Sequence, residues 1–175
     1  MRSTTDVLSQ YAAYHRDHRN IVSHFVGVPM IVFAVGVLIA RPSFTLGEML
    51  LTPAWIGFAL AAAWYLTRGN VALGAATSAA VGLLILLAHK AADGSVSAWL
   101  TWGLGVFVVG WAIQFVGHWY EGRKPAFVDD LIGLLVAPMF VTAEVLFMLG
   151  WNKALLAEIE KRVGPTVLRD LAKIA

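Results

Sequence analysis

The stretch YAAYHRDHRNIVSHFVGVP, residues 11–29, places His15, His18 and His24 within ten residues at the start of a long apolar segment. A fourth histidine, His118, ends a later apolar segment, within the sequence QFVGHWYEGRKPA. The chain has five histidines in all, so four of them lie at two segment ends that are far apart in the sequence. We interpret this pattern as a metal site at one surface of a membrane.

The composition of the chain is that of an integral membrane protein. Of its 175 residues, 59% are hydrophobic and 14% are charged, which lies outside the range of soluble domains. The chain has no cysteine, so thiolate ligands, disulfides and cysteine nucleophiles are excluded, and a metal ion must be bound by nitrogen and oxygen. A net charge of +2 from scattered basic residues argues against nucleic acid as a partner.

We expect one all-α, polytopic membrane domain over residues 1–175. An amphipathic N-terminal segment, 1–20, precedes the membrane region, 21–150, and an amphipathic tail, 151–175, is expected to lie along the membrane surface. The apolar runs predict about five transmembrane helices, at residues 21–40, 53–67, 71–89, 98–119 and 128–150. The second of these is short for a crossing.

Five crossings would place the N-terminus, the turn at 68–70 and the loop at 121–127 on the same side of the membrane. The four histidines of the two quoted sequences would then face one surface. His89, at the far end of the third predicted helix, would face the other one.

Each of these polar features also has a simpler explanation. Histidines near a membrane interface are often surface residues of an amphipathic segment. Asp129 and Asp130 are favourable charges at a helix N-terminus, and Arg123 and Lys124 are common as interfacial anchors. Glu144 lies well inside a predicted span, where an ionisable group is costly unless it is functional or paired.

We expect Glu144 to pair with His89 or Lys90. Gln114, His118 and Glu121, spaced by four and then three residues, form a polar stripe at the end of the fourth predicted helix.

Two groups of residues carry a resemblance to a known family. They are Tyr14-His15, Asn20, His24 and Val28-Pro29 in the first half, and Phe115-Val116-Gly117-His118, Pro125-Ala126, Asp129, Ala137-Pro138 and Glu144 in the second. With these residues the chain resembles, over about residues 11–150, the membrane family of fungal 2-hydroxy fatty acid dioxygenases and their bacterial relatives. The resemblance implies an iron(II)-dependent enzyme that uses O₂ to shorten a 2-hydroxy fatty acid by one carbon during α-oxidation. It also implies that His15, His24 and His118 are the iron ligands.

The residues suit this chemistry on their own. Iron(II) that binds both O₂ and a substrate needs a few imidazole or carboxylate ligands and open positions. A 2-hydroxy acid could chelate the metal through its carboxylate and hydroxyl while its alkyl tail enters the apolar region. Glu121 and Asp129 are the predicted catalytic carboxylates, which would hold the second nitrogen of a ligating imidazole. Arg123 and Lys124 are predicted to bind the substrate carboxylate.

Two other classes of function remain open from the sequence. A metal or proton carrier would use His89 and Glu144 as part of a path across the membrane, but it needs polar residues along several spans, and the first and third are nearly bare of them. A non-catalytic protein that binds lipid or acts as a scaffold would hold no metal. The expected partners are the 2-hydroxy fatty acid, O₂ and membrane lipids. The expected location is the inner or plasma membrane of a bacterium or the endoplasmic reticulum of a fungus.

Overall fold

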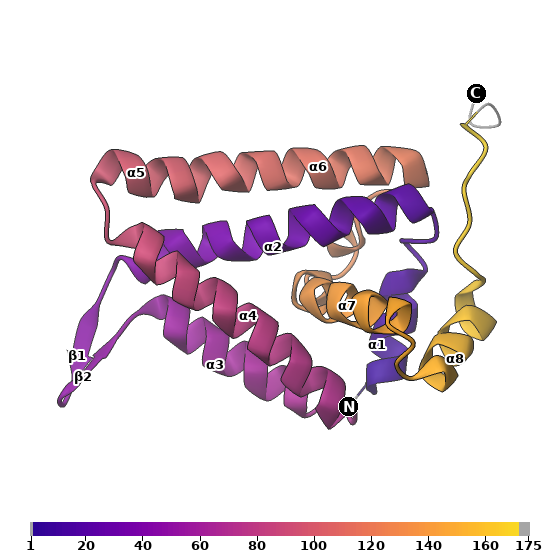
Figure 1. Ribbon diagram of the computed structural model, residues 1–175, viewed down its shortest axis with the longest axis horizontal. Coiled ribbons are helices and arrows are strands. Elements are labelled where there is room, and N and C mark those ends of the chain that lie inside the picture. Colours follow the sequence, from indigo (N-terminus) through magenta and orange to yellow (C-terminus); the bar gives the residue numbers. More distant parts are fainter. Residues whose placement is uncertain (1, 172–175) are drawn as a thin grey trace.

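The computed structural model describes residues 2–171, and these are almost entirely helical (Figure 1). The α-helices are α1 (Thr4–Ala12), α2 (His18–Ala40), α3 (Pro53–Leu66), α4 (Val71–Ala92), α5 (Val96–Leu100), α6 (Val106–Glu121), α7 (Ile132–Met148) and α8 (Lys153–Val163). A π-helical turn, Thr101–Gly105, joins α5 to α6, and a 3₁₀ turn, Ala126–Val128, precedes α7. An antiparallel hairpin of two short strands, β1 (Phe44–Leu46) and β2 (Met49–Leu51), joins α2 to α3. The predicted all-α class is confirmed, with this hairpin as the exception.

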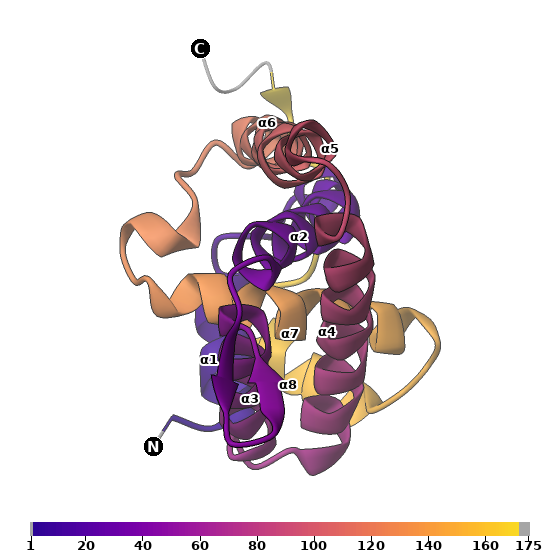
Figure 2. The same ribbon diagram turned by 90° about the vertical axis from the view of Figure 1, so that its left-hand side faces the viewer.

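Helix α2 is the element against which much of the chain packs. Helices α3, α4, α6 and α7 all contact it, and α6 runs beside it in the opposite direction (Figures 1 and 2). The helix begins at the N-cap Asp17, whose carboxylate accepts a hydrogen bond from the backbone N–H of Arg19. It then continues through Pro29 to Ala40, where the chain turns into the hairpin.

Glycines allow α2 and α6 to approach each other closely. A Cβ atom added to Gly27 would lie 3.0 Å from the carbonyl oxygen of Gly110, and one added to Gly117 would lie 2.0 Å from Oγ of Ser23. Small residues at such contacts let helix backbones pack tightly within a membrane. This close approach brings the start of α2 and the end of α6 together, where the histidines lie.

Helices α3 and α4 form a second antiparallel pair. Thr52 caps α3 ahead of Pro53, and Asn70 caps α4. The turn between them includes Gly69, which has a φ of +93°. A Cβ on Gly74 would lie 2.6 Å from the carbonyl oxygen of Tyr65, so these two backbones also touch.

The number of membrane spans differs from the prediction. Three helical segments are long and apolar enough to cross a membrane, namely α2, α4 and the continuous run from Val96 to Glu121. The count rises to four if α7 and α8, which are bent by 118°, are taken as one broken span. Helix α3 has only 14 residues, or about 21 Å, against a hydrocarbon core of about 30 Å. The chain is therefore an integral membrane protein by its candidate spans, but five spans are not supported.

The first and last helices of the described chain pack together. Helix α1 contacts both α7 and α8, and α8 buries Leu155 and Ile159. Arg162 of α8 reaches Asp6 of α1 at 2.9 Å. The predicted amphipathic tail is thus one helix followed from Gly164 by an extended segment, and residues 172–175 lie outside the described range.

The expected pairing of Glu144 is wrong. Its carboxylate lies 4.0 Å from Nη2 of Arg16, while His89 lies 2.9 Å from the hydroxyl of Thr52 through its Nε2. The expectation assumed that α7 crosses straight to the far surface. Instead α1 folds back along α7, which brings Arg16 to the C-terminal half of α7.

Candidate metal centre and active site

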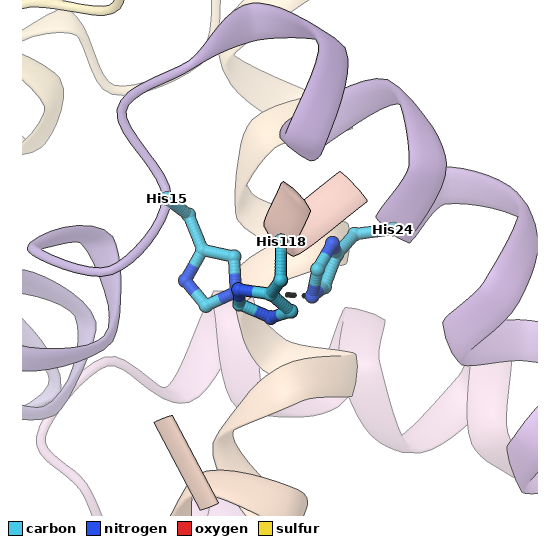
Figure 3. Close-up of side chains that lie close together, drawn as sticks. All are labelled: His15, His24 and His118. Atoms are coloured by element: carbon cyan, nitrogen blue, oxygen red, sulfur yellow. Dashed lines mark hydrogen bonds between the residues drawn. The ribbon is translucent and has the colours of Figure 1, made fainter. Parts of the chain in front are cut away.

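Three histidines from distant parts of the chain meet at one end of the α2 and α6 pair (Figure 3). His15 lies between α1 and α2, His24 in the second turn of α2, and His118 near the end of α6. The ring centroids are 4.3 Å apart for His15 and His24, 4.9 Å for His15 and His118, and 5.3 Å for His24 and His118. All three side chains are buried. The structure thus brings together the three residues that the sequence predicted as ligands.

Main-chain contacts fix how two of these rings point. Nδ1 of His15 lies 2.7 Å from the carbonyl oxygen of Tyr11, and Nδ1 of His24 lies 2.8 Å from that of Asn20. A carbonyl oxygen can only accept a hydrogen bond, so each Nδ1 carries the hydrogen and each Nε2 carries a lone pair. This is the neutral form in which histidine binds a metal ion through Nε2.

The two Nε2 atoms of His15 and His24 face each other at 3.0 Å. Two lone pairs at that distance repel unless a cation lies near both. A proton is disfavoured, because burial and the neighbouring His24 and His118 rings hold the pKa of His15 well below its ordinary value. Two ligand nitrogens at right angles around an ion, each at about 2.1 Å from it, would themselves lie about 3.0 Å apart.

The donor set therefore fits a metal ion. One nitrogen from each of the three histidines lies within 4.8 Å of the others. All three donors are imidazoles, which suit zinc, copper, iron and nickel, so the cluster indicates a metal site without selecting the element.

Aromatic packing holds the His15 ring in place. Tyr11 stacks on it with the ring centroids 4.1 Å apart and the planes 7° from parallel, and Phe140 lies at 5.4 Å. Burial raises the pKa of the Tyr11 phenol, so that side chain is neutral. Uncharged aromatic rings thus enclose the candidate metal site on the side of His15.

The carboxylate of Glu121 ties the end of α6 to the segment that carries His15. One oxygen accepts a hydrogen bond from the backbone N–H of Arg16 at 3.1 Å. The other accepts from the backbone N–H of Asp17 at 2.8 Å and from the side chain of Asn20 at 3.1 Å. Glu121 is only 3% exposed, and none of the described contacts joins it to a histidine ring. In this structure Glu121 holds the backbone next to His15, whereas the sequence predicted that it would hold an imidazole nitrogen.

The extended C-terminal segment covers the same connection from the outside. The backbone N–H of His18 donates to the carbonyl of Val167, and the N–H of Val167 donates to the carbonyl of Arg16. Asp17 is fully buried and accepts hydrogen bonds from the Arg19 side chain and from the backbone N–H of Arg169. The Arg19 guanidinium, together with these N–H groups, lowers the pKa of Asp17 to about 2, so it is ionised.

The other predicted site residues lie on the loop between α6 and α7. Asp129 accepts hydrogen bonds from Lys124 at 2.5 Å and from the Tyr14 hydroxyl at 2.9 Å. These bonds lower the pKa of Asp129, and Lys124 has the larger effect. Arg123 donates to the carbonyl of Ala13 at 2.7 Å. Asp129, Lys124 and Arg123 are exposed and lie outside the group of buried histidines. Their predicted roles stay predictions.

The two remaining histidines do not join the cluster. His18 is exposed at the first residue of α2. His89 stacks on Trp55 with ring centroids 4.8 Å apart and makes the contact with Thr52 described above. His89 is therefore part of the packing between α3 and α4.

Gln114 is a candidate residue that the sequence analysis noted in a polar stripe but did not assign to the site. It lines a small cavity beside His24 and His118, with a volume of about 60 Å³. The side chain is 4% exposed, and neither its oxygen nor its nitrogen has a hydrogen-bond partner among the described residues. A buried amide without a partner is costly, which suggests that it meets a ligand. The sequence feature that could have identified Gln114 as a site residue is its position, one turn before the predicted ligand His118 inside an apolar helix.

Comparison with known proteins decides the family. The family model described as "Mpo1-like: 2-hydroxy-palmitic acid dioxygenase Mpo1-like" matches residues 1–149. The chain belongs to this family. It is also 34% identical over 160 residues to the 2-hydroxy-palmitic acid dioxygenase MPO1 of Saccharomyces cerevisiae, which covers 87% of this chain and 85% of the yeast protein. No solved structure matches the chain.

Membership of the Mpo1-like family confirms the resemblance inferred from the two histidine blocks. The chain is accordingly a dioxygenase of the family whose substrates are 2-hydroxy fatty acids. The matched residues include all three buried histidines, Gln114 and Glu121, whereas α8 and the extended segment lie beyond the matched range.

The first prediction concerns metal content. His24→Ala and His118→Ala each remove one nitrogen donor, and the bound metal per protein should fall to about a tenth or less, since even residues behind the ligands change affinity 10–100-fold. Elemental analysis of the detergent-purified proteins measures this. His89→Ala is the control and should keep the metal of the unmodified protein. Equal loss in all three variants would contradict the three-histidine site.

The second prediction separates positioning from ligation. Glu121→Ala leaves two backbone N–H groups buried without acceptors, which should lower stability by about 1–3 kcal/mol and weaken metal binding. Thermal unfolding and metal titration measure the two effects. Because no ligand is lost, excess iron(II) should restore full metal occupancy, which it should not do for His118→Ala. Glu158→Ala, which breaks a surface pair with Arg162, is the matched control. Failure of excess metal to fill the Glu121 variant would indicate that Glu121 is itself a ligand.

Proposed function

We propose that this protein is an iron(II)-dependent dioxygenase that converts a 2-hydroxy fatty acid into the fatty acid one carbon shorter. The observation that carries the proposal is the convergence of His15, His24 and His118, the last two of which line a cavity whose other walls are largely apolar. An iron(II) ion held by three imidazoles would supply the redox chemistry for O₂ and would keep coordination positions open. Family membership supports the reaction, and the donor set is compatible with iron.

The proposed reaction balances without a further reductant. The bond between C1 and C2 of the 2-hydroxy acid breaks, C1 leaves as CO₂, and C2 becomes the carboxyl carbon of the product. The substrate gives up four electrons to O₂, whose reduction yields one water for each product molecule. Each turnover therefore consumes one 2-hydroxy acid and one O₂.

The protein's own groups would bind and orient the substrate. The cavity beside His24 and His118 is also lined by the Gln114 amide, which has no hydrogen-bond partner among the described residues, and otherwise mostly by apolar residues such as Val28, Ile31 and Leu134. An amide can donate a hydrogen bond to a carboxylate and accept one from a hydroxyl. We propose that Gln114 contacts the polar head of the substrate and that the apolar walls exclude water from it.

The predicted carboxylates and cations take different roles in this proposal. Glu121 positions the backbone at Arg16 and Asp17, directly after His15, so it acts on catalysis through His15. Pro125 and Ala126 line the cavity, and they lie between Lys124 and Asp129 on one loop. The proposed role of Arg123 and Lys124 is to attract the substrate carboxylate at the outer face of that loop, with Asp129 holding Lys124 in place.

The carrier hypothesis loses the residues on which it depended. It required His89 and Glu144 to mark one path at the far surface. His89 contacts Thr52, whereas Glu144 is near Arg16, next to the histidine cluster. No observed contact joins the two into a path among the residues described.

The third prediction is the reaction itself. Purified protein loaded with iron(II) in detergent should consume O₂ and release CO₂ and the shortened fatty acid in equal amounts when given 2-hydroxypalmitic acid. Palmitic acid lacks the second chelating oxygen and should react poorly. Mass spectrometry of the products and an oxygen electrode measure both. His118→Ala should abolish turnover. Iron-loaded protein that leaves 2-hydroxy fatty acids of every chain length unchanged in the presence of O₂ would overturn the proposal.

The fourth prediction tests Gln114. Gln114→Leu keeps the volume but removes the amide, so kcat/KM should fall about 10–100-fold, the value of a hydrogen bond to a charged group, while metal content stays constant. Steady-state kinetics together with elemental analysis separate these readouts. Ala112→Leu, at an exposed position of α6, is the control. An unchanged kcat/KM in the Gln114 variant would remove this residue from the substrate site.

A further inference from the structure

A second and larger cavity lies behind the candidate active site. Its volume is about 400 Å³, and its walls come from α2, α3, α4, α6 and α7. We call it the chamber. Its lining is apolar throughout, and only Tyr65 and Trp111 carry a polar atom there. Among the described residues no charged side chain lines it, so the chamber suits a hydrocarbon and not a polar ligand.

The chamber adjoins the cavity that contains the histidines. Four residues line both spaces, and we call them the waist: Ile31, Val32, Trp111 and Leu134. On one side of the waist are His24, His118 and the unpaired amide of Gln114. On the other side the walls are aliphatic and aromatic. Along the path through the waist, the lining therefore changes from polar at the histidines to apolar in the chamber.

The length of this path matches a long hydrocarbon tail. On α2 the lining extends from His24 to Ile39, a distance of 15 residues or about 22 Å along the helix axis. Half of a bilayer hydrocarbon core, the depth that a lipid tail fills, is about 15 Å. A tail whose head group lies at the histidines can therefore pass the waist and reach well into the chamber.

We propose that the chamber holds the distal part of the substrate's alkyl tail and thereby sets the chain length that the enzyme prefers. This inference rests on the proposed function for the identity of the head group. The occupant of the chamber is the tail of a 2-hydroxy fatty acid, because such a molecule places a polar head at Gln114 and an apolar tail in the chamber. Each methylene that enters the chamber should raise kcat/KM about fourfold, from about 0.8 kcal/mol for a buried CH₂.

Ala61 and Ala63 on α3 provide a matched pair of substitutions. Ala61 lines the chamber, whereas Ala63 is exposed and does not line it. Ala61→Phe fills part of the chamber, so kcat/KM for the longest 2-hydroxy acids should fall at least about tenfold while the shortest accepted chains keep their rate. Ala63→Phe should leave the whole profile unchanged. Turnover is measured across even chain lengths from 12 to 24 carbons, with melting temperature as the check on folding.

Phe58→Ala tests the same idea in the opposite direction. Phe58 lines the chamber and packs over Gly82 of α4, so its truncation enlarges the space. The preferred chain length should then shift upward by two or more carbons. Identical chain-length profiles in the unmodified protein, Ala61→Phe and Phe58→Ala, with all three folded and active, would overturn the chamber proposal and leave the proposed function standing.

A binding experiment keeps the two proposals apart if turnover fails. A 2-hydroxy fatty acid with a photoreactive diazirine at its terminal carbon is added to the iron-loaded protein without oxygen, so that it binds without reacting. Peptide mapping should find the label on α3 and α4 residues of the chamber, and Ala61→Phe should reduce it. Chamber labelling without any turnover would refute the chemistry and support the tail site. Label confined to outward-facing residues such as Leu60 and Leu86 would show that the chamber holds no substrate tail.

Discussion

The hydrogen bonds of the Glu121 carboxylate are the interaction on which the site depends. They join the last turn of α6 to the backbone N–H groups just before α2, more than a hundred residues earlier in the chain. A buried carboxylate with three donors is stable, whereas its removal leaves the donors unpaired. Because His118 lies one turn before Glu121 and His15 directly precedes Arg16, the same bonds set the distance between two candidate ligands.

The rest of the bundle can be understood as support for this junction. The glycine contacts between α2 and α6 bring the two helix ends together, and the α3 and α4 pair lies against α2 and closes the far side of the chamber. The result is a partly open space with nitrogen donors at one end and hydrocarbon walls at the other. That order of polarity matches an amphipathic acid in a membrane, whose head and tail have opposite solvation needs.

Much of the site was predictable from the sequence, since His15, His24 and His118 are rare residues at the ends of apolar segments. Their placement on one membrane surface was inferred from five crossings, which the structure does not support. The three histidines nevertheless lie together, as that placement predicted. Glu121 was recognised, but not its backbone partners, because a carboxylate that accepts from N–H groups has no sequence signature. Glu144 was misplaced since its partner depends on how α1 folds back. The pairing of Val167 with the α1–α2 connection was likewise not predictable, because backbone hydrogen bonds are independent of side-chain identity.

That backbone pairing has a topological consequence. Hydrogen-bonded residues lie at the same membrane depth, so the chain between them must cross an even number of times. Thr4 bonds to Arg68, Asp17 to Glu121 and His18 to Val167. Between 4 and 68 lie α2 and α3, and between 17 and 121 lie α2, α3, α4 and the α5–α6 run, so both bonds require α3 to return the chain to the side on which α2 begins. Between 121 and 167 the helices are α7 and α8, which are bent by 118° and together are either one broken span or a re-entrant pair. A fifth crossing by α7 alone would therefore place His18 and Val167 on opposite sides of the membrane, against the hydrogen bond that joins them.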